Sequence, residues 1–171
     1  VGVVRLKISL RLILVVVLVT GPVMVSQAQE TRSKRILPMI SAHRGASMVA
    51  PENTLIAFSK AMELGADFIE IDVRSTGDGV QVILHDGSLK RTTGLEAKVE
   101  KTSLVKIKEL SAGYWFGSQF EDQRVPTLEE VCELVKNENT HRTQHVKLYV
   151  DCKSIDADEV IQLLNKHNLL D

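Results

Sequence analysis

Short apolar runs alternate with amphipathic helical runs along most of this 171-residue chain. The apolar runs predict strands at residues 39–42, 67–73, 80–84 and 146–151. The patterns between and after them predict helices at residues 53–64, 127–136 and 156–167. Asn53 is the predicted N-cap of the first helix, and Thr127 with Glu130 forms a predicted capping box. Strands that alternate with helices form parallel, helix-covered sheets, so the chain is predicted to be an α/β protein.

The link between the second and third predicted strands is too short for a parallel crossover. Only residues 74–79 separate them, whereas parallel strands need about a dozen connecting residues or more. These two strands are therefore predicted to form an antiparallel hairpin. With the turn centred on Gly77 and Asp78, the numbers of paired residues sum to 155, which sets His85 opposite Glu70; a slip by one residue stays open.

The segment that follows the hairpin carries few helix or strand signals. Residues 86–125 are predicted to be irregular, apart from one helical turn near residues 104–110. Together with the hairpin, this segment makes an excursion from the parallel series, an insertion over about residues 74–125.

The first 28 residues have the three parts of a secretory signal peptide. Arg5, Lys7 and Arg11 are basic, residues 12–19 form an unbroken apolar run, and residues 26–28 (Ser-Gln-Ala) suit a cleavage site. The apolar run is short for a bilayer span. We expect cleavage after Ala28, a polar tether over residues 29–38, and a secreted or periplasmic protein that meets the membrane only through this leader.

Beyond residue 28 the chain is mildly acidic. Without the three basic residues of the leader, 18 of the chain's 21 Lys and Arg face 22 Asp and Glu, a formal charge of −4. Nucleic-acid binding needs a basic face, so no nucleic-acid partner is predicted. A small phosphate-containing molecule is compatible with this charge, because one local Arg or Lys can hold a phosphate.

Polar side chains gather at the carboxyl ends of the predicted parallel strands. They are His43, Arg44, Glu70, Asp72, Asp151 and Lys153. Residues two apart in a strand share a side, so Glu70 and Asp72 point together, as do Asp151 and Lys153. The hairpin brings His85 back to the same edge. In a (β/α) barrel this edge is the active-site face.

Three converging carboxylates repel one another unless a positive charge lies between them. A hard divalent cation with oxygen ligands, Ca²⁺ or Mg²⁺, is the simplest solution; Zn²⁺ bound through the histidines stays open, although no tight histidine spacing supports it. Arg44 and Lys153 are then left to hold an anion, and a phosphoryl group bridges naturally to such a metal. His43 and His85 could share general acid and base catalysis.

These residues belong to a set of motifs that resembles the glycerophosphodiester phosphodiesterase family. The matching segments, in order, are His43-Arg44-Gly45, Pro51-Glu52-Asn53-Thr54, Glu70-Ile71-Asp72-Val73, Asp78-Gly79, His85-Asp86, Arg91-Thr92-Thr93 and Val125-Pro126-Thr127-Leu128-Glu129-Glu130. The resemblance extends from about residue 40 to the C-terminus, and the combined motifs are highly specific.

The resemblance implies a TIM barrel with a small insertion after its second strand. A whole barrel has eight strands in about 250 residues. This chain supplies three of them plus the hairpin, so we expect residues 39–171 to form an incomplete barrel, the N-terminal part of the domain.

The resemblance also implies functional roles for the residues that match it. It assigns metal binding to Glu70 and Asp72, acid/base catalysis to His43 and His85, and phosphate contact to Arg44. The family's later Glu-x-Lys is Asp151-Cys152-Lys153 here, and aspartate offers oxygen ligands with one methylene less reach. Glu52 is predicted to order the loop at the mouth of the site.

The implied reaction is hydrolysis of glycerophosphodiesters to sn-glycerol 3-phosphate and an alcohol. Two alternatives stay open. One is a phospholipase D-like lyase of the same barrel type, which leaves a cyclic phosphate. The other is a non-catalytic or degenerate phosphate-binding domain.

Overall fold

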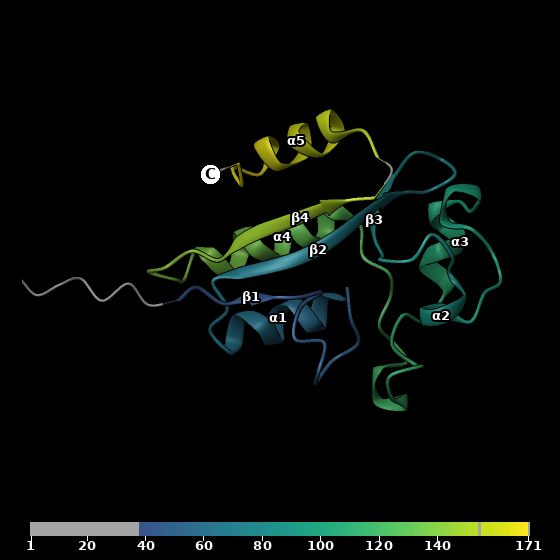
Figure 1. Ribbon diagram of the computed structural model, residues 1–171, viewed down its shortest axis with the longest axis horizontal. Coiled ribbons are helices and arrows are strands. Elements are labelled where there is room, and N and C mark those ends of the chain that lie inside the picture. The colour runs from purple at the N-terminus through teal and green to yellow at the C-terminus, as the bar shows by residue number, and fades with distance from the viewer. Residues whose placement is uncertain (1–37, 154, 171) are drawn as a thin grey trace, which may run out of the picture. The chain divides into compact units, whose positions relative to one another are not determined.

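The computed structural model of the chain describes residues 38–153 and 155–170 (Figure 1). The predicted signal peptide, its cleavage site after Ala28 and nearly all of the predicted tether lie outside these residues. Within the described ranges, no helix is both long and apolar enough to cross a membrane.

Strand β2 (Phe68–Ser75) is the centre of the sheet. Strand β1 (Ser41–Ala42) pairs with its first residues and β4 (Lys147–Cys152) pairs along most of its length, both in parallel. Strand β3 (Gln81–Ile83) pairs antiparallel with the end of β2. Because Val73 has a partner in both β3 and β4, these two strands lie on opposite edges of β2. The parallel series and the hairpin are therefore as predicted.

The hairpin register differs by one residue from the predicted one. Val73 lies opposite Ile83, so paired residue numbers sum to 156 instead of 155. The reason is the turn, in which Thr76 N–H donates to the carbonyl oxygen of Val80, so that three residues form the loop instead of two. Gly79 closes this loop in the left-handed conformation, with φ +82°. His85 consequently follows β3 and is not paired opposite Glu70.

Three helices pack on the sheet. Helix α1 (Leu55–Glu63) follows β1, α4 (Leu128–Asn139) precedes β4, and α5 (Ala157–Lys166) follows it. Figure 1 shows α4 lying behind β2 and β4. The buried side chains that join helices to sheet include Phe58, Met62, Ile69, Ile71, Val73, Val131, Val135, Val160 and Leu164. Because β2 turns alternate residues toward these helices, its other face is left for polar side chains.

The helix starts agree with the sequence in two cases of three. Thr127 and Glu130 form the predicted capping box of α4, and Asp156 caps α5. The N-cap of α1, however, is Thr54 and not Asn53. Asn53 takes a left-handed conformation, with φ +56°, and its side chain turns away from the helix toward Asp72.

The excursion after β3 has a small core of its own. It contains α2 (Lys90–Thr93), α3 (Leu104–Glu109) and two 3₁₀ turns, Val99–Lys101 and Ser118–Phe120. This core joins Val82 of β3 to the following buried residues of the excursion: Leu84, Leu89, Val99, Ile107, Ala112 and Val125. The predicted turn near residues 104–110 is α3, whereas α2 was not predicted, since four residues carry little periodic signal.

Gly45 sits where the loop after β1 presses on α1. Its φ is +81°, and a Cβ built on it would lie 2.8 Å from the carbonyl carbon of Ala57. Gly65 has nearly the same φ, +84°, but a Cβ there would meet nothing within 4 Å. The two glycines therefore separate the cost of backbone conformation from the cost of close packing.

We expect Gly65→Ala to lower the free energy of unfolding by about 1–2 kcal/mol, the cost of a left-handed alanine. Gly45→Ala should lower it by about 2–5 kcal/mol, because overpacking against α1 adds to the same backbone cost. Urea unfolding followed by circular dichroism measures both. Equal losses in the two variants would contradict the close packing at Gly45.

Candidate active site

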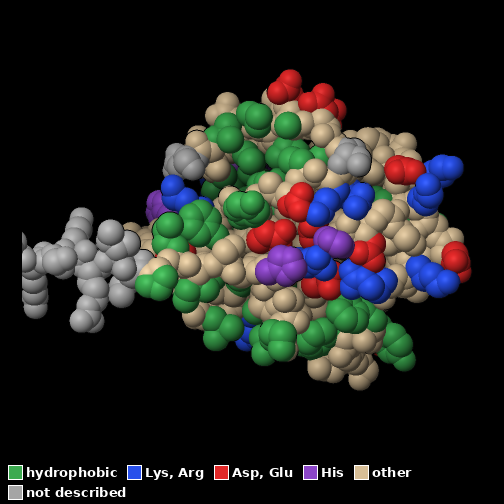
Figure 2. Space-filling model, in the orientation of Figure 1, with side chains coloured by type: hydrophobic (Ala, Val, Ile, Leu, Met, Phe, Trp, Pro, Cys, Tyr) green, Lys and Arg blue, Asp and Glu red, His purple; other side chains and the backbone are tan. Residues whose placement is uncertain are grey.

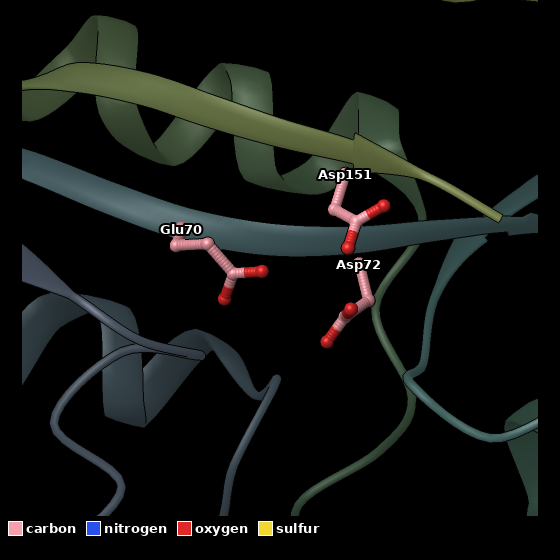
Figure 3. Close-up of side chains that lie close together, drawn as sticks. All are labelled: Glu70, Asp72 and Asp151. Atoms are coloured by element: carbon pink, nitrogen blue, oxygen red, sulfur yellow. The ribbon is translucent and has the colours of Figure 1, made fainter.

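Three carboxylates converge in front of the sheet. Glu70 and Asp72 come from β2 and Asp151 from β4, where Asp151 lies in register with Asp72. One oxygen atom of each lies within 4.8 Å of the others, and Figure 3 shows the three side chains grouped together. Glu70 and Asp72 are buried, with exposed fractions of 8% and 1%. The predicted convergence of these residues is therefore present in the structure.

Asp72 is the most buried of the three, and positive or polar groups surround it. Its carboxylate lies 3.3 Å from Nε of Arg44 and 3.3 Å from Nζ of Lys153, and Nδ2 of Asn53 donates to it at 2.8 Å. Lys153 also donates to Asp151. The two cations predicted to hold an anion thus balance the acidic cluster in this structure.

Two polar atoms beside the cluster have no hydrogen-bond partner among the described residues. They are Nε of Arg44 and Oδ1 of Asn53, and both are buried. The contact of Arg44 with Asp72 is therefore one of charge, which leaves its Nε–H available as a donor. A free donor and a free acceptor next to three carboxylates suit a site that takes both an anion and a cation.

Glu70 lies in an environment that favours its neutral form. Burial raises the pKa of Glu70, and the charge of Asp72 adds to the rise. The backbone N–H of Arg44, which donates to Oε2 of Glu70 at 2.8 Å, works in the opposite direction. A cation bound among the carboxylates would offset the part of this rise in pKa that comes from the charge of Asp72, and would favour the ionised form of Glu70.

The loop after β1 carries His43 and Arg44 to the edge of the cluster. Arg44 has φ +58° and Asn53 has φ +56°, and the N–H of Asn53 donates to the carbonyl oxygen of Arg44 at 3.0 Å. Two non-glycine residues in the left-handed region are unusual and typical of functional loops. This backbone conformation brings the side chains of Arg44 and Asn53 against Asp72, while His43 is exposed.

His85 reaches the same region from β3, which pairs with the same edge of β2 as β1, opposite β4. Leu84 N–H donates to the carbonyl oxygen of Asp72 at 2.9 Å, which fixes the chain just before His85. Figure 2 shows histidine side chains among acidic and basic side chains in the middle of this face. The structure thus places the predicted residues from three strand ends together, although His85 arrives by a different register.

Glu52 links the loop after β1 to the excursion. It accepts hydrogen bonds from Nη1 of Arg44 at 3.0 Å and from Nη1 and Nη2 of Arg91 at 3.0 and 2.7 Å. Although burial tends to raise it, the bonds and charges of Arg91 and Arg44 bring the pKa of Glu52 below its usual value. These contacts suit the loop-ordering role predicted for it.

Sequence reasoning assigned no functional role to Asn53, Asp86 or Arg91. Asn53 looked like a helix cap, because its left-handed conformation leaves no mark in the sequence. Asp86 and Arg91 lie within motifs already noted, and their five-residue spacing in a segment with little periodicity gave no sign that they form an ion pair, with Nε of Arg91 2.7 Å from Oδ2 of Asp86.

Comparison with known proteins agrees with this geometry. Residues 43–169 match the family model described as the glycerophosphoryl diester phosphodiesterase family. A glycerophosphodiester phosphodiesterase of Caldanaerobacter subterraneus is 52% identical over 97 residues, which are 57% of this chain and 40% of that protein. One from Bacillus subtilis is 37% identical over 142 residues, 75% of this chain and 46% of that protein. The chain thus spans less than half the length of these relatives.

Solved structures show the same arrangement of strands and helices. A glycerophosphodiester phosphodiesterase from Agrobacterium tumefaciens matches with a TM-score of 0.72 and 34% identity, over 78% of this chain and 55% of that one. A phosphodiesterase from Oleispira antarctica, solved in complex with the product sn-glycerol-3-phosphate, matches with a TM-score of 0.69 and 35% identity, over 77% and 53% of the two chains. The open sheet of the present chain is therefore part of a TIM-type barrel.

The family model covers most of the chain, and the site brings together the motifs around His43, Glu52, Glu70, His85 and Arg91 on which much of the resemblance rested. The chain belongs to the glycerophosphoryl diester phosphodiesterase family.

Proposed function

We propose that the protein hydrolyses glycerophosphodiesters to sn-glycerol 3-phosphate and an alcohol with the help of a divalent metal. The observation that carries this proposal is the convergence of Glu70, Asp72 and Asp151 within 4.8 Å of one another, at the edge that also holds the predicted histidines. The substrate class is supported by the family and by the glycerol phosphate bound to the Oleispira relative.

Glu70, Asp72 and Asp151 are the residues that would hold the metal. Three carboxylate oxygens this close form a donor set suited to Ca²⁺ or Mg²⁺, which prefer oxygen ligands. The unpartnered Oδ1 of Asn53 beside them fits a site that accommodates a cation or its bound water. A metal bound there would act as a Lewis acid toward the phosphoryl oxygens.

Arg44 and Lys153 are proposed to bind the phosphate group. Nε of Arg44 lies 3.3 Å from Oδ2 of Asp72, and Nζ of Lys153 lies 3.3 Å from Oδ1. An anion beside this carboxylate is therefore within reach of the two cations. The pKa of Lys153 is raised, chiefly by its hydrogen bond to Asp151, so the ammonium group keeps its charge at neutral pH. The planar guanidinium of Arg44 suits a phosphate that presents two oxygens.

His43 and His85 are proposed to move the protons. One imidazole accepts a proton from the attacking hydroxyl or water, and the other gives a proton to the leaving alkoxide, so the two side chains end with exchanged protonation states. Glu52 holds the intervening loops through Arg44 and Arg91 and takes no part in the proton transfer.

The predicted leader supports a proposal about location. We propose that the protein is exported to the periplasm or the medium after cleavage behind Ala28, and that its substrate is a small molecule. N-terminal sequencing of the exported protein tests this point, and a mature protein that retains residues 1–28 would contradict it.

The purified protein, supplied with Ca²⁺ or Mg²⁺ and containing the whole barrel, is expected to release glycerol phosphate from glycerophosphocholine, measured by an enzyme-coupled assay. His43→Ala should lower kcat at least about 100-fold, because proton transfer contributes about 10²–10⁴-fold. Glu63→Gln changes an exposed carboxylate on α1 and should leave the rate unchanged. Equal rates for His43→Ala and the unaltered chain would contradict the proposal.

Phosphorus NMR of the products separates the alternatives. A cyclic phosphate would identify a lyase of the same barrel type. Binding of glycerophosphocholine and metal without turnover would favour the phosphate-binding domain. Hydrolysis gives glycerol phosphate, with no cyclic product accumulating.

Calorimetry with Ca²⁺ and Mg²⁺ is expected to show one site that Glu70→Gln and Asp72→Asn each weaken at least about tenfold, because each removes a charged ligand. Asp151→Glu keeps the charge and the oxygen donors and should bind. Glu63→Gln is the matched control. The affinity for the metal should fall as the pH is lowered. The fall should begin at a higher pH than at a site of exposed carboxylates, because the raised pKa of Glu70 lets protons compete with the metal at higher pH. Unchanged affinity in Glu70→Gln would overturn the assignment.

A further inference from the structure

His85 is held by its backbone and by one side of its ring. Nε and Nη2 of Arg74, on β2, donate to the carbonyl oxygen of His85 at 2.9 and 2.6 Å. On the ring, Nδ1 lies 2.8 Å from Oδ1 of Asp86. With the preceding Leu84 also bonded to β2, the backbone of His85 is fixed, and the contact with Asp86 orients its ring.

Asp86 is itself fixed by Arg91. Nε of Arg91 donates to Oδ2 at 2.7 Å and Nη2 to Oδ1 at 3.2 Å, a two-point contact with one carboxylate. The same guanidinium donates to Glu52, and its central carbon lies 6.0 Å from the centre of the Trp115 ring. The bond from Arg91 is the main reason that the pKa of Asp86 falls to about 2, so the carboxyl group is ionised at neutral pH.

An ionised carboxylate can only accept hydrogen bonds. The ring nitrogen that faces Asp86 must therefore carry a hydrogen, which makes Nδ1 the donor. In the neutral imidazole the other nitrogen, Nε2, then holds the lone pair and lies on the side of the ring away from Asp86. The contact thus selects one of the two tautomers of His85.

We propose that Asp86, anchored by Arg91, is a positioning residue that fixes His85 in the Nδ1–H tautomer and so reserves Nε2 for proton exchange with the substrate. The use of Nε2 rests on the proposed function, whereas the tautomer rests on the contacts alone. The two side chains are about one-third exposed, so as an ion pair they would add little to stability. The effect of the contact is instead to place a proton on Nδ1 of His85.

The proposal holds for either direction of proton transfer. As a base, neutral His85 takes the proton of the attacking O–H at Nε2 and becomes an imidazolium that Asp86 stabilises. As an acid, the imidazolium gives its Nε2 proton to the alkoxide and returns to the Nδ1–H form. In both cases Asp86 keeps its charge and gains no proton.

Nitrogen NMR of the chain labelled with ¹⁵N-histidine tests the tautomer without any need for activity. The chain has five histidines, and His85→Gln identifies the signals of His85. At a pH where the ring is neutral, the unaltered chain should show Nδ1 protonated and Nε2 unprotonated. An Nε2–H form in the unaltered chain would overturn the proposal, and that measurement depends on no variant at Asp86.

Asp86→Asn keeps the size of the side chain but can turn an amide N–H toward Nδ1, so His85 should shift toward the Nε2–H tautomer. Arg91→Gln should weaken the preference in the same direction. Glu96→Gln breaks an exposed ion pair with Lys90 in the same excursion and should leave the signals unchanged. An unchanged tautomer in a folded Asp86→Asn variant would contradict the proposal.

Kinetics provide a second readout. Asp86→Asn should lower kcat about 10- to 100-fold with little change in KM, since it alters proton transfer and leaves the predicted phosphate and metal ligands in place. If the unaltered chain hydrolyses no glycerophosphodiester, the proposed function fails, while the NMR result still decides the tautomer. An equal kcat in Asp86→Asn with an altered tautomer would show that His85 takes no part in the reaction.

Discussion

The alternation of side chains along β2 is the constraint on which the rest of the site depends. Ile69, Ile71 and Val73 are fully buried against the helices, so Glu70 and Asp72 must lie on the opposite face. Shifting the strand by one residue would bury both acids in the apolar core, at a cost of several kcal/mol for each unpaired charge. The hydrophobic packing of the sheet therefore fixes the position of the carboxylates as firmly as any contact within the site.

Burial of two acids creates an excess of negative charge that other parts of the chain balance. Arg44 comes from the loop after β1, Lys153 from the end of β4, and Asn53 adds an amide donor to Asp72. Arg44 and Asn53 lie in the loop between β1 and α1, whereas Lys153 follows β4, so the site forms only when the sheet has assembled. The arrangement also explains why the residues suited to bind phosphate lie so close to the proposed metal ligands. The cationic side chains that can bind phosphate also balance the charge of the carboxylates that can bind a metal.

Short-range patterns in the sequence were sufficient to predict the strands, the hairpin and the convergence of the carboxylates. Periodicity and the common direction of parallel strands determine these three features. The register of the hairpin was wrong by one residue, since it depends on whether Gly79 joins the turn. The cap of α1 was misplaced because Asn53 adopts a left-handed backbone and bonds to β2. The ion pairs of Arg91 could not be predicted from the sequence, because its acidic partners Glu52 and Asp86 come together around it only in the folded chain.

Arg91 connects the two loops that carry the histidines. Through Glu52 it reaches Arg44, the neighbour of His43, and through Asp86 it reaches the ring of His85. These are charge-assisted hydrogen bonds of 2.7–3.0 Å, which are strongly directional, so a displacement of one loop strains the bonds of the other. The excursion therefore has a structural role at the site as well as forming the connection after β3. By supplying one guanidinium between two carboxylates, it sets the relative placement of two side chains that follow different strands, His43 after β1 and His85 after β3.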